Sequence, residues 1–179
     1  MIFENTAIEG VLIIGHYVHE DARGSFVKTF HNEEFTSKGL ETDFRESYYT
    51  YSQKNVIRGM HFQACPHDHA KLVTIIHGTV EDVILDLRRN SKTLGQHITV
   101  ELSRQNSKSI YLPRGCAHGF KVLSESAIVY YLVTSQHAPS HDMGIRFDSF
   151  NYDWKINNPI VSERDLRFPK FANFENFFS

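Results

Sequence analysis

The segment NVIRGMHFQ, residues 55–63, places an arginine, a histidine and a glutamine in an apolar context. A guanidinium matches the geometry of a phosphate, and an imidazole titrates near neutral pH, so Arg58 could bind phosphate and His61 could act as a general base. On a regular strand the two side chains would point to opposite faces, unless Gly59 bends or bulges the strand. The alternative is a surface arginine and a packed core histidine.

Three more histidines raise the question of a metal site. The segment PRGCAHGF, residues 113–120, resembles the second cupin motif, in which a P-x-G-x-x-H turn delivers a histidine to the mouth of a β-barrel. A metal-binding cupin also needs H-x-H followed by a glutamate, but no carboxylate follows His67 and His69 where the ligand set requires one. This disfavours a metal, although His67, His69 and His118 could still form a three-histidine site.

The composition excludes several classes of protein. The chain has 179 residues and a net charge of -2, from 19 Lys and Arg against 21 Asp and Glu, so no uniform basic field favours nucleic acid or anionic membranes. Its apolar stretches are far shorter than the roughly 20 residues of a membrane helix, and its first residues lack the order of a signal peptide. Cys65 and Cys116 form neither a CxxC pair nor a disulfide framework. We therefore expect one cytoplasmic domain over residues 1–179.

The elements that would position these side chains are short strands. Nine segments are rich in β-branched or aromatic residues and bounded by turn residues: 10–18, 25–30, 46–53, 70–78, 79–88, 95–103, 108–113, 118–124 and 127–134. Their regular spacing predicts an all-β antiparallel sandwich or barrel. One short helix is expected over 32–39, with Asn32 as its cap and Gly39 at its end, and the tail from Pro159 is expected to be irregular or shortly helical.

Taken together, six segments resemble the dTDP-4-dehydrorhamnose 3,5-epimerase family of deoxysugar biosynthesis. They are ARGSF (22–26), NVIRGMHFQ (55–63), AKLVTIIHGTVEDVILDLRRNSKTLGQ (70–96), LPRGCAHGF (112–120), AIVYYLVTSQHAPSHDMGIRF (127–147) and PIVSERDLRFP (159–169). The resemblance implies a cupin jelly roll over about residues 46–135, with the N-terminal strands and C-terminal tail packed on it. It also implies a homodimer without cofactor or metal that acts on a nucleotide-linked 4-keto-6-deoxyhexose, as in rhamnose, lipopolysaccharide and O-antigen synthesis.

Epimerisation beside a ketone needs three groups. The C4 ketone acidifies the hydrogens on C3 and C5, because the carbanion delocalises onto the carbonyl oxygen as an enolate. An enzyme therefore needs a base on one face of the ring, a cation or donor at the ketone oxygen, and an acid on the opposite face.

The resemblance assigns these roles to particular residues. His61 would be the base, and Asp165 the carboxylate that orients it and stabilises the imidazolium. Lys71 would stabilise the enolate, and Tyr131 would be the acid. Taken alone, Asp165 would be a turn acid, Lys71 a solvated lysine and Tyr131 a core aromatic. Strand alternation sends only one of Tyr130 and Tyr131 inward, and the resemblance selects Tyr131.

Substrate-binding residues follow from the same resemblance. Arg23 and Arg58 would bind the diphosphate, since a guanidinium fork matches phosphate geometry, and Phe26 would stack on the nucleobase. Three residues would support the site: Gln63, His118 and Asp82 as a partner of His118.

The chain departs from the family at recognition positions. Glu46 and Tyr48 stand where the family usually carries a Gln and an Asn that contact the ligand. Gln136 and His137 replace a pair of tyrosines, one of which flanks the nucleobase. Lys28 replaces a base-reading glutamate. These changes leave the proton-transfer set intact, so we expect the same reaction class on a variant substrate.

The sequence leaves several functions open. One is a single-position epimerase acting on a CDP-linked sugar, because Lys28 can donate to N3 of cytosine whereas thymine presents an N–H donor. The alternative is that Lys28 turns outward or reaches a phosphate, and that thymidine is retained through Phe26. A metal-dependent cupin using His67, His69 and His118, and a non-catalytic sugar-nucleotide-binding cupin, are the remaining candidates.

Overall fold

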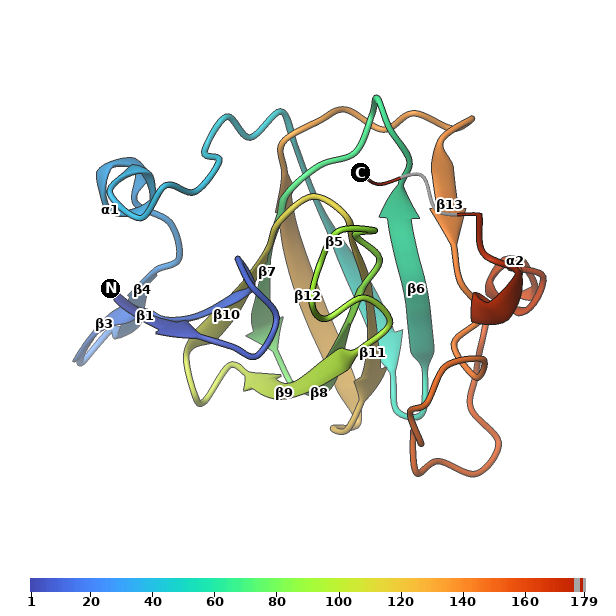
Figure 1. Ribbon diagram of the computed structural model, residues 1–179. Coiled ribbons are helices and arrows are strands. Elements are labelled where there is room, and N and C mark those ends of the chain that lie inside the picture. Colours follow the sequence, from blue (N-terminus) through green and yellow to red (C-terminus); the bar gives the residue numbers. More distant parts are fainter. Residues whose placement is uncertain (176–177, 179) are drawn as a thin grey trace.

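The computed structural model describes residues 1–175 and 178 (Figure 1). Its strands are β1 (Ile2–Asn5), β2 (Leu12–Gly15), β3 (Tyr17–Asp21), β4 (Gly24–Lys28), β5 (Glu46–Gln53), β6 (Ile57–Gln63), β7 (Lys71–His77), β8 (Thr79–Asp86), β9 (His97–Ser103), β10 (Lys108–Leu112), β11 (Cys116–Val122), β12 (Ser126–Val133) and β13 (Asp142–Gly144). The helices are α1 (Asn32–Thr36), α2 (Glu163–Leu166) and the 3-10 turn η1 (Phe171–Asn173).

Two antiparallel sheets form the body of the molecule. One has the strand order β1-β2-β10-β7-β12-β5 and the other the order β13-β6-β11-β8-β9. The main apolar core includes Val73 and Val129 from the first sheet and Ile84 and Phe120 from the second. The predicted all-β jelly-roll sandwich is confirmed.

Side-chain alternation explains which face of each strand is buried. In β12, Val129, Tyr131 and Val133 are buried, while Ile128 and Tyr130 are half-buried on the other face. This period of two is that of a strand with one face on the core. The predictions that only one of Tyr130 and Tyr131 faces inward, and that this residue is Tyr131, are therefore confirmed.

The second sheet is covered on both faces, which explains its continuous apolar strands. All seven residues of β11 are buried. A second cluster joins Val83, Leu85 and Ala117 from this sheet to Phe147 and Trp154 of the C-terminal segment. The C-terminal segment thus packs over the outer face of the sheet, where Figure 1 shows it beside β13 and β6. As predicted, its regular structure is limited to short helical turns.

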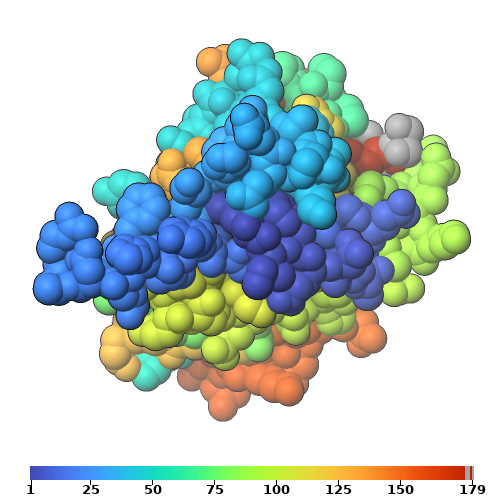
Figure 2. Space-filling model, turned by 90° about the vertical axis from the view of Figure 1, so that its left-hand side faces the viewer, coloured from blue at the N-terminus to red at the C-terminus, as the bar shows by residue number. Residues whose placement is uncertain are grey.

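The N-terminal region differs from the sequence-based expectation. The strand predicted over 10–18 is two strands, because the pairing of β2 with β10 ends at Gly15 opposite Lys108, and β3 then pairs with β4 in a separate hairpin. Three strands of the structure, β1, β6 and β13, were not among the predicted strands. Figure 2 shows this face, where the N-terminal strands, the hairpin and the α1 region form the surface and the hairpin projects to one side.

The helix α1 begins at Asn32, one residue earlier than it would if Asn32 were its N-cap. Its N-cap is His31, without a side-chain capping bond, so the assignment of Asn32 as the cap was wrong. The helix ends at Thr36 with Ser37 as its C-cap, so the predicted end at Gly39 was wrong; Gly39, with a φ of +73 that glycine adopts without steric cost, lies in the turn that follows. Among the described residues, no helix has the length and apolar character needed to cross a membrane.

Candidate active site

A cavity of about 310 Å³ opens between the two sheets. It is lined by side chains from β5, β6, β7, β11 and β12 and from the C-terminal segment. The lining residues are Glu46, Tyr48, Thr50, Arg58, His61, Phe62, Gln63, His69, Lys71, His118, Phe120, Tyr131, Val133, His137, Asp142 and Arg164. The cavity therefore brings together three of the four predicted catalytic residues, and the fourth contacts one of them.

His61 and Asp165 form a hydrogen-bonded pair across more than a hundred residues of sequence. The Nε2 of His61 lies 2.9 Å from Oδ1 of Asp165, and the backbone N–H of Gly59 donates to Oδ2 at 3.1 Å. Asp165 is buried. Burial alone would raise the pKa of Asp165, but the hydrogen bonds from His61 and Gly59 lower it below its usual value. An ionised Asp165 accepts a hydrogen bond from the N–H at Nε2 of His61. The neutral imidazole then carries its proton on Nε2, and the lone pair of Nδ1 is free.

Burial also keeps His61 in its neutral form. It lowers the pKa of the imidazole, and the hydrogen bond and charge of Asp165 only partly oppose this effect. A neutral imidazole with one free ring nitrogen can remove a proton at neutral pH. The geometry thus suits His61 to act as a general base.

Gly59 brings Arg58 and His61 to the same cavity. The pairing of β6 with β11 shifts register between His61 and Arg58, and Gly59 has a φ of +138. A Cβ on Gly59 would lie 2.5 Å from the Cα of Gly119, so no larger residue fits. This irregularity breaks the alternation that would separate the two side chains, and the expected bend at Gly59 is confirmed. The guanidinium of Arg58 is held by Ser52 Oγ at 2.9 Å.

Lys71 supplies a buried cation to the cavity. Only 7% of its surface is exposed, and its Nζ donates to the backbone carbonyl of His61 at 3.3 Å. Burial lowers the pKa of Lys71 to about 8. The ammonium is therefore still mostly protonated at pH 7, in surroundings where a charge acts strongly on a nearby anion.

Tyr131 lies against Tyr48 in the cavity wall. The two residues are direct partners across β12 and β5, and their rings stack at 4.7 Å with an interplanar angle of 21°. Burial raises the pKa of Tyr131 well above 10, so its phenol carries a proton at neutral pH. Tyr131 can therefore donate a proton inside the cavity.

Comparison with known proteins shows the family of this chain. Residues 5–173 match the family described as dTDP-4-dehydrorhamnose 3,5-epimerase. The chain belongs to this family. A Methanothermobacter thermautotrophicus protein named dTDP-4-dehydrorhamnose 3,5-epimerase is 39% identical over 168 residues, which are 91% of this chain and 90% of the relative.

Solved structures of similar proteins share the fold. The dTDP-4-dehydrorhamnose 3,5-epimerase from Elizabethkingia anophelis superposes with a TM-score of 0.92 at 36% identity over 99% of both chains. The Legionella pneumophila enzyme, solved in complex with dTDP-4-keto-L-rhamnose, has a TM-score of 0.92 at 31% identity, covering 97% of this chain and 94% of that one. The resemblance of the six segments is thus confirmed, and this family member is an isomerase.

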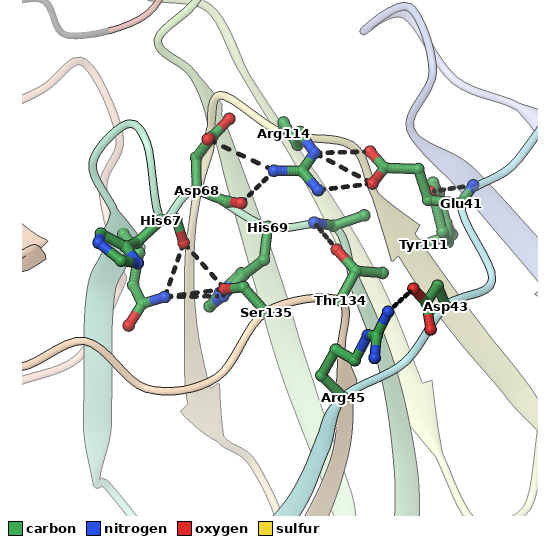
Figure 3. Close-up of polar contacts among 12 residues, drawn as sticks. Glu41, Asp43, Arg45, His67, Asp68, His69, Tyr111, Arg114, Thr134 and Ser135 are labelled. Carbon is green, nitrogen blue, oxygen red and sulfur yellow. Dashed lines mark hydrogen bonds and ion pairs between the residues drawn. The ribbon is translucent and has the colours of Figure 1, made fainter.

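Two of the three predicted supporting residues contact each other. His118 Nε2 lies 2.8 Å from Asp82 Oδ2, and both side chains are fully buried. Gln63 lines the cavity and ties two loop segments together, since it donates to the carbonyl of His67 in one and accepts from the N–H of Ala138 in the other. Figure 3 shows the adjoining contacts, in which Ser135 Oγ donates to the carbonyl of His67 and lies 3.0 Å from Nδ1 of His69. These hydrogen bonds fix the segment that leads into β7.

The three-histidine metal site is not formed by this chain. His67 packs on His141 with ring centroids 4.5 Å apart, His69 contacts Gln63 and Ser135, and His118 pairs with Asp82. Residues 1–175 and 178 contain no group of three or more His, Cys, Asp or Glu side chains arranged to hold a metal ion. The metal-dependent alternative therefore loses its ligand set.

Four predicted substrate-binding residues do not line the cavity of their own chain. Arg23, Phe26 and Lys28 lie on the β3–β4 hairpin, at the opposite edge of the molecule from β6 and α2 (Figure 1). The side chain of Arg23 is 89% exposed and Phe26 is 58% exposed. The fourth, Gln136, is exposed, and its carbonyl accepts from Gln63.

The cavity also contains two charged residues that the sequence did not single out, Asp142 and Arg164. Arg164 Nη2 lies 2.7 Å from Asp142 Oδ2, and His137 Nε2 lies 3.2 Å from the same carboxylate. Glu46, which was predicted, accepts from the N–H of His137 at 2.8 Å. Arg164 directly precedes Asp165 in the sequence, and this adjacency could have predicted that Arg164 lies near the site.

Proposed function

We propose that this protein epimerises C3 and C5 of a dTDP-linked 4-keto-6-deoxyhexose. The observation that carries the proposal is a single cavity lined by a carboxylate-paired histidine, a buried lysine and a buried tyrosine. The names of its relatives, and the dTDP-4-keto-L-rhamnose complex of the Legionella protein, support the choice of substrate.

Each proton transfer is assigned to one residue. His61 takes the proton from the carbon beside the ketone, and the electron pair of the broken C–H bond moves onto the ketone oxygen as an enolate. The ammonium of Lys71 stabilises this negative charge. Tyr131 then gives its phenolic proton to the same carbon from the opposite face, which inverts it. Exchange with water returns a proton to Tyr131 and removes one from His61.

The protonation states at neutral pH suit these roles. The burial of His61 lowers its pKa and keeps the base neutral, whereas the burial of Tyr131 raises its pKa and keeps the acid protonated. Lys71, with a pKa of about 8, is mostly charged at pH 7. Two groups whose surroundings push their pKa values apart are a natural base and acid.

We further propose that the enzyme is a homodimer in which the β3–β4 hairpin of one copy completes the cavity of the other. Arg58 is the predicted diphosphate ligand that lines the cavity, while Arg23 and Phe26 stand exposed on the hairpin. A second copy would bring this arginine and this ring to the diphosphate and the nucleobase.

An exposed apolar face supports association of two copies. Tyr49, Tyr51 and Ile76 are 68%, 57% and 46% exposed, and they lie on the outer face of the sheet beside Ile128 and Tyr130. Exposed apolar clusters of this kind mark protein–protein contact surfaces. We expect the dimer to act in the cytoplasm, with no nucleic-acid or membrane partner.

Two finer alternatives concern specificity. The same acid and base would also serve an enzyme that inverts only C3 or only C5. A CDP-linked substrate remains the rival to dTDP because Lys28 would donate to N3 of cytosine.

The test is incubation with dTDP- and CDP-linked 4-keto-6-deoxyglucose in deuterated water, followed by NMR of the ring positions. We expect deuterium and inversion at both C3 and C5 of the dTDP-sugar. Label at one carbon would indicate a single-position epimerase, and no label in either sugar would refute the proposal.

A mixing experiment tests the dimer. Arg23→Ala and His61→Ala variants, each nearly inactive, are mixed, dissociated and reassociated. If Arg23 acts across the dimer, a mixed dimer has one complete site and recovers activity. If Arg23 acts within its own chain, both sites stay defective and no activity returns.

A further inference from the structure

The ring of Tyr48 covers one face of the Tyr131 ring. The centroids are 4.7 Å apart and the rings are nearly parallel, at 21°. The imidazole of His118 meets Tyr131 edge-on, at 5.9 Å and 76°. The phenol of Tyr131 therefore has an aromatic neighbour in each of two directions.

Both neighbours are themselves held in place. Tyr48 is the direct cross-strand partner of Tyr131 in the pairing of β5 with β12, on the same face of the sheet. His118 is fixed by its hydrogen bond to the fully buried Asp82. The stack is thus built from the strand register and does not depend on a bound ligand.

We propose that Tyr48 is a positioning residue that holds Tyr131 in the orientation from which it donates its proton. This inference rests on the proposed epimerase function. The sequence alone placed Tyr48 among residues that contact substrate. The stack gives it a second role, which acts through the acid and not through the sugar.

The role has a specific kinetic consequence. After His61 removes a proton, the enolate either receives a proton from Tyr131 on the opposite face, which inverts the carbon, or from the base face, which restores the original sugar. In deuterated water the second outcome labels the sugar without inverting it. A Tyr131 ring that spends less time in the donating orientation raises the ratio of exchange without inversion to inversion.

Two variants separate the ring from its hydroxyl. Tyr48→Leu keeps apolar bulk but removes the stack, and we expect it to raise that ratio by about 2- to 12-fold, the factor that corresponds to the usual strength of an aromatic pair. Tyr48→Phe keeps the stack, and we expect its ratio to stay within about twofold of wild type. A substrate contact of the hydroxyl would change KM in both variants but would leave the ratio unchanged.

The measurement is the time course of deuterium at C3 and C5 in remaining sugar and in product, by NMR, with circular dichroism to establish folding. If Tyr48→Leu does not fold, Tyr48→His, which retains a planar ring of smaller area, is measured in its place and is expected to give an intermediate ratio. An unchanged ratio in the variant measured, or an equal rise in Tyr48→Phe, would overturn the inference while leaving the epimerase intact. Wild-type protein without any exchange would overturn the epimerase function and, with it, this inference.

Discussion

Replacing Asp165 with asparagine changes one carboxylate oxygen into an amide nitrogen of nearly the same size. In the native site both oxygens accept hydrogen bonds, one from His61 and one from the N–H of Gly59. An amide has one oxygen and two N–H donors, so it cannot accept from both partners. If the amide oxygen keeps Gly59, its nitrogen faces His61, and the imidazole must carry its proton on Nδ1. The free lone pair is then lost from the ring nitrogen that acts as the base.

The size of the effect follows from the role of the base. General base catalysis contributes about 10²- to 10⁴-fold in rate, so we expect Asp165→Asn to lower kcat/KM by about that factor, or about 3 to 5 kcal/mol of transition-state stabilisation. One mismatched buried hydrogen bond should also lower the free energy of unfolding by about 1 to 3 kcal/mol. Because Asp165 raises the pKa of His61, its loss should move the acidic limb of the pH profile to lower pH.

The assay is the initial rate of epimerisation from pH 5 to 9, with urea unfolding of the same samples. Glu163→Gln is the matched control, since Glu163 lies on the same helix with its side chain 86% exposed and bonded to Arg167. We expect this control to keep wild-type rate and stability. If Asp165→Asn retained its rate within threefold across this range, the orientation of His61 by Asp165 would be wrong.

The remaining predictions use the same preparation. The rate of wild-type enzyme should fall as the pH rises through about 8, because Lys71 loses its proton. It should fall again at acidic pH, below the usual range of a histidine, because burial lowers the pKa at which His61 gains a proton. A flat profile would contradict both assignments. Exhaustive chelation should leave turnover unchanged, as checked by metal analysis of the active protein, and tightly bound metal whose removal stops the reaction would refute this. Tyr131→Phe should retain solvent exchange while losing inversion, and NMR showing wild-type inversion would remove Tyr131 as the acid. If Lys28 reads the base, CDP should bind more tightly than dTDP, and Lys28→Glu should reverse the order by about 1 to 3 kcal/mol in calorimetric titration.

Much of the fold could be read from local signals. Alternating apolar residues predicted most of the strands from Glu46 onward to within a few residues, because a half-buried strand needs that period, but β6 and β13 were not among the predicted strands. Another exception was the N-terminal segment, where one apolar run spans β2 and β3 in different sheets. The break at Gly15 depends on where β10 ends, and β10 lies about ninety residues away. The strand propensity of a local segment cannot reveal its pairing with a strand so far away in the sequence.

The spacing of strand-like segments predicted an all-β sandwich. The motifs indicated the family and, through that resemblance, the residues proposed for proton transfer. Tertiary structure decided their arrangement. It joined Asp165 to His61, turned Arg58 and His61 to one cavity through Gly59, and stacked Tyr48 on Tyr131. It also left Arg23, Phe26 and Lys28 outside that cavity. The physical reason is that the charge state and aim of each side chain depend on burial and on partners far away in the sequence, which only the folded chain brings into contact.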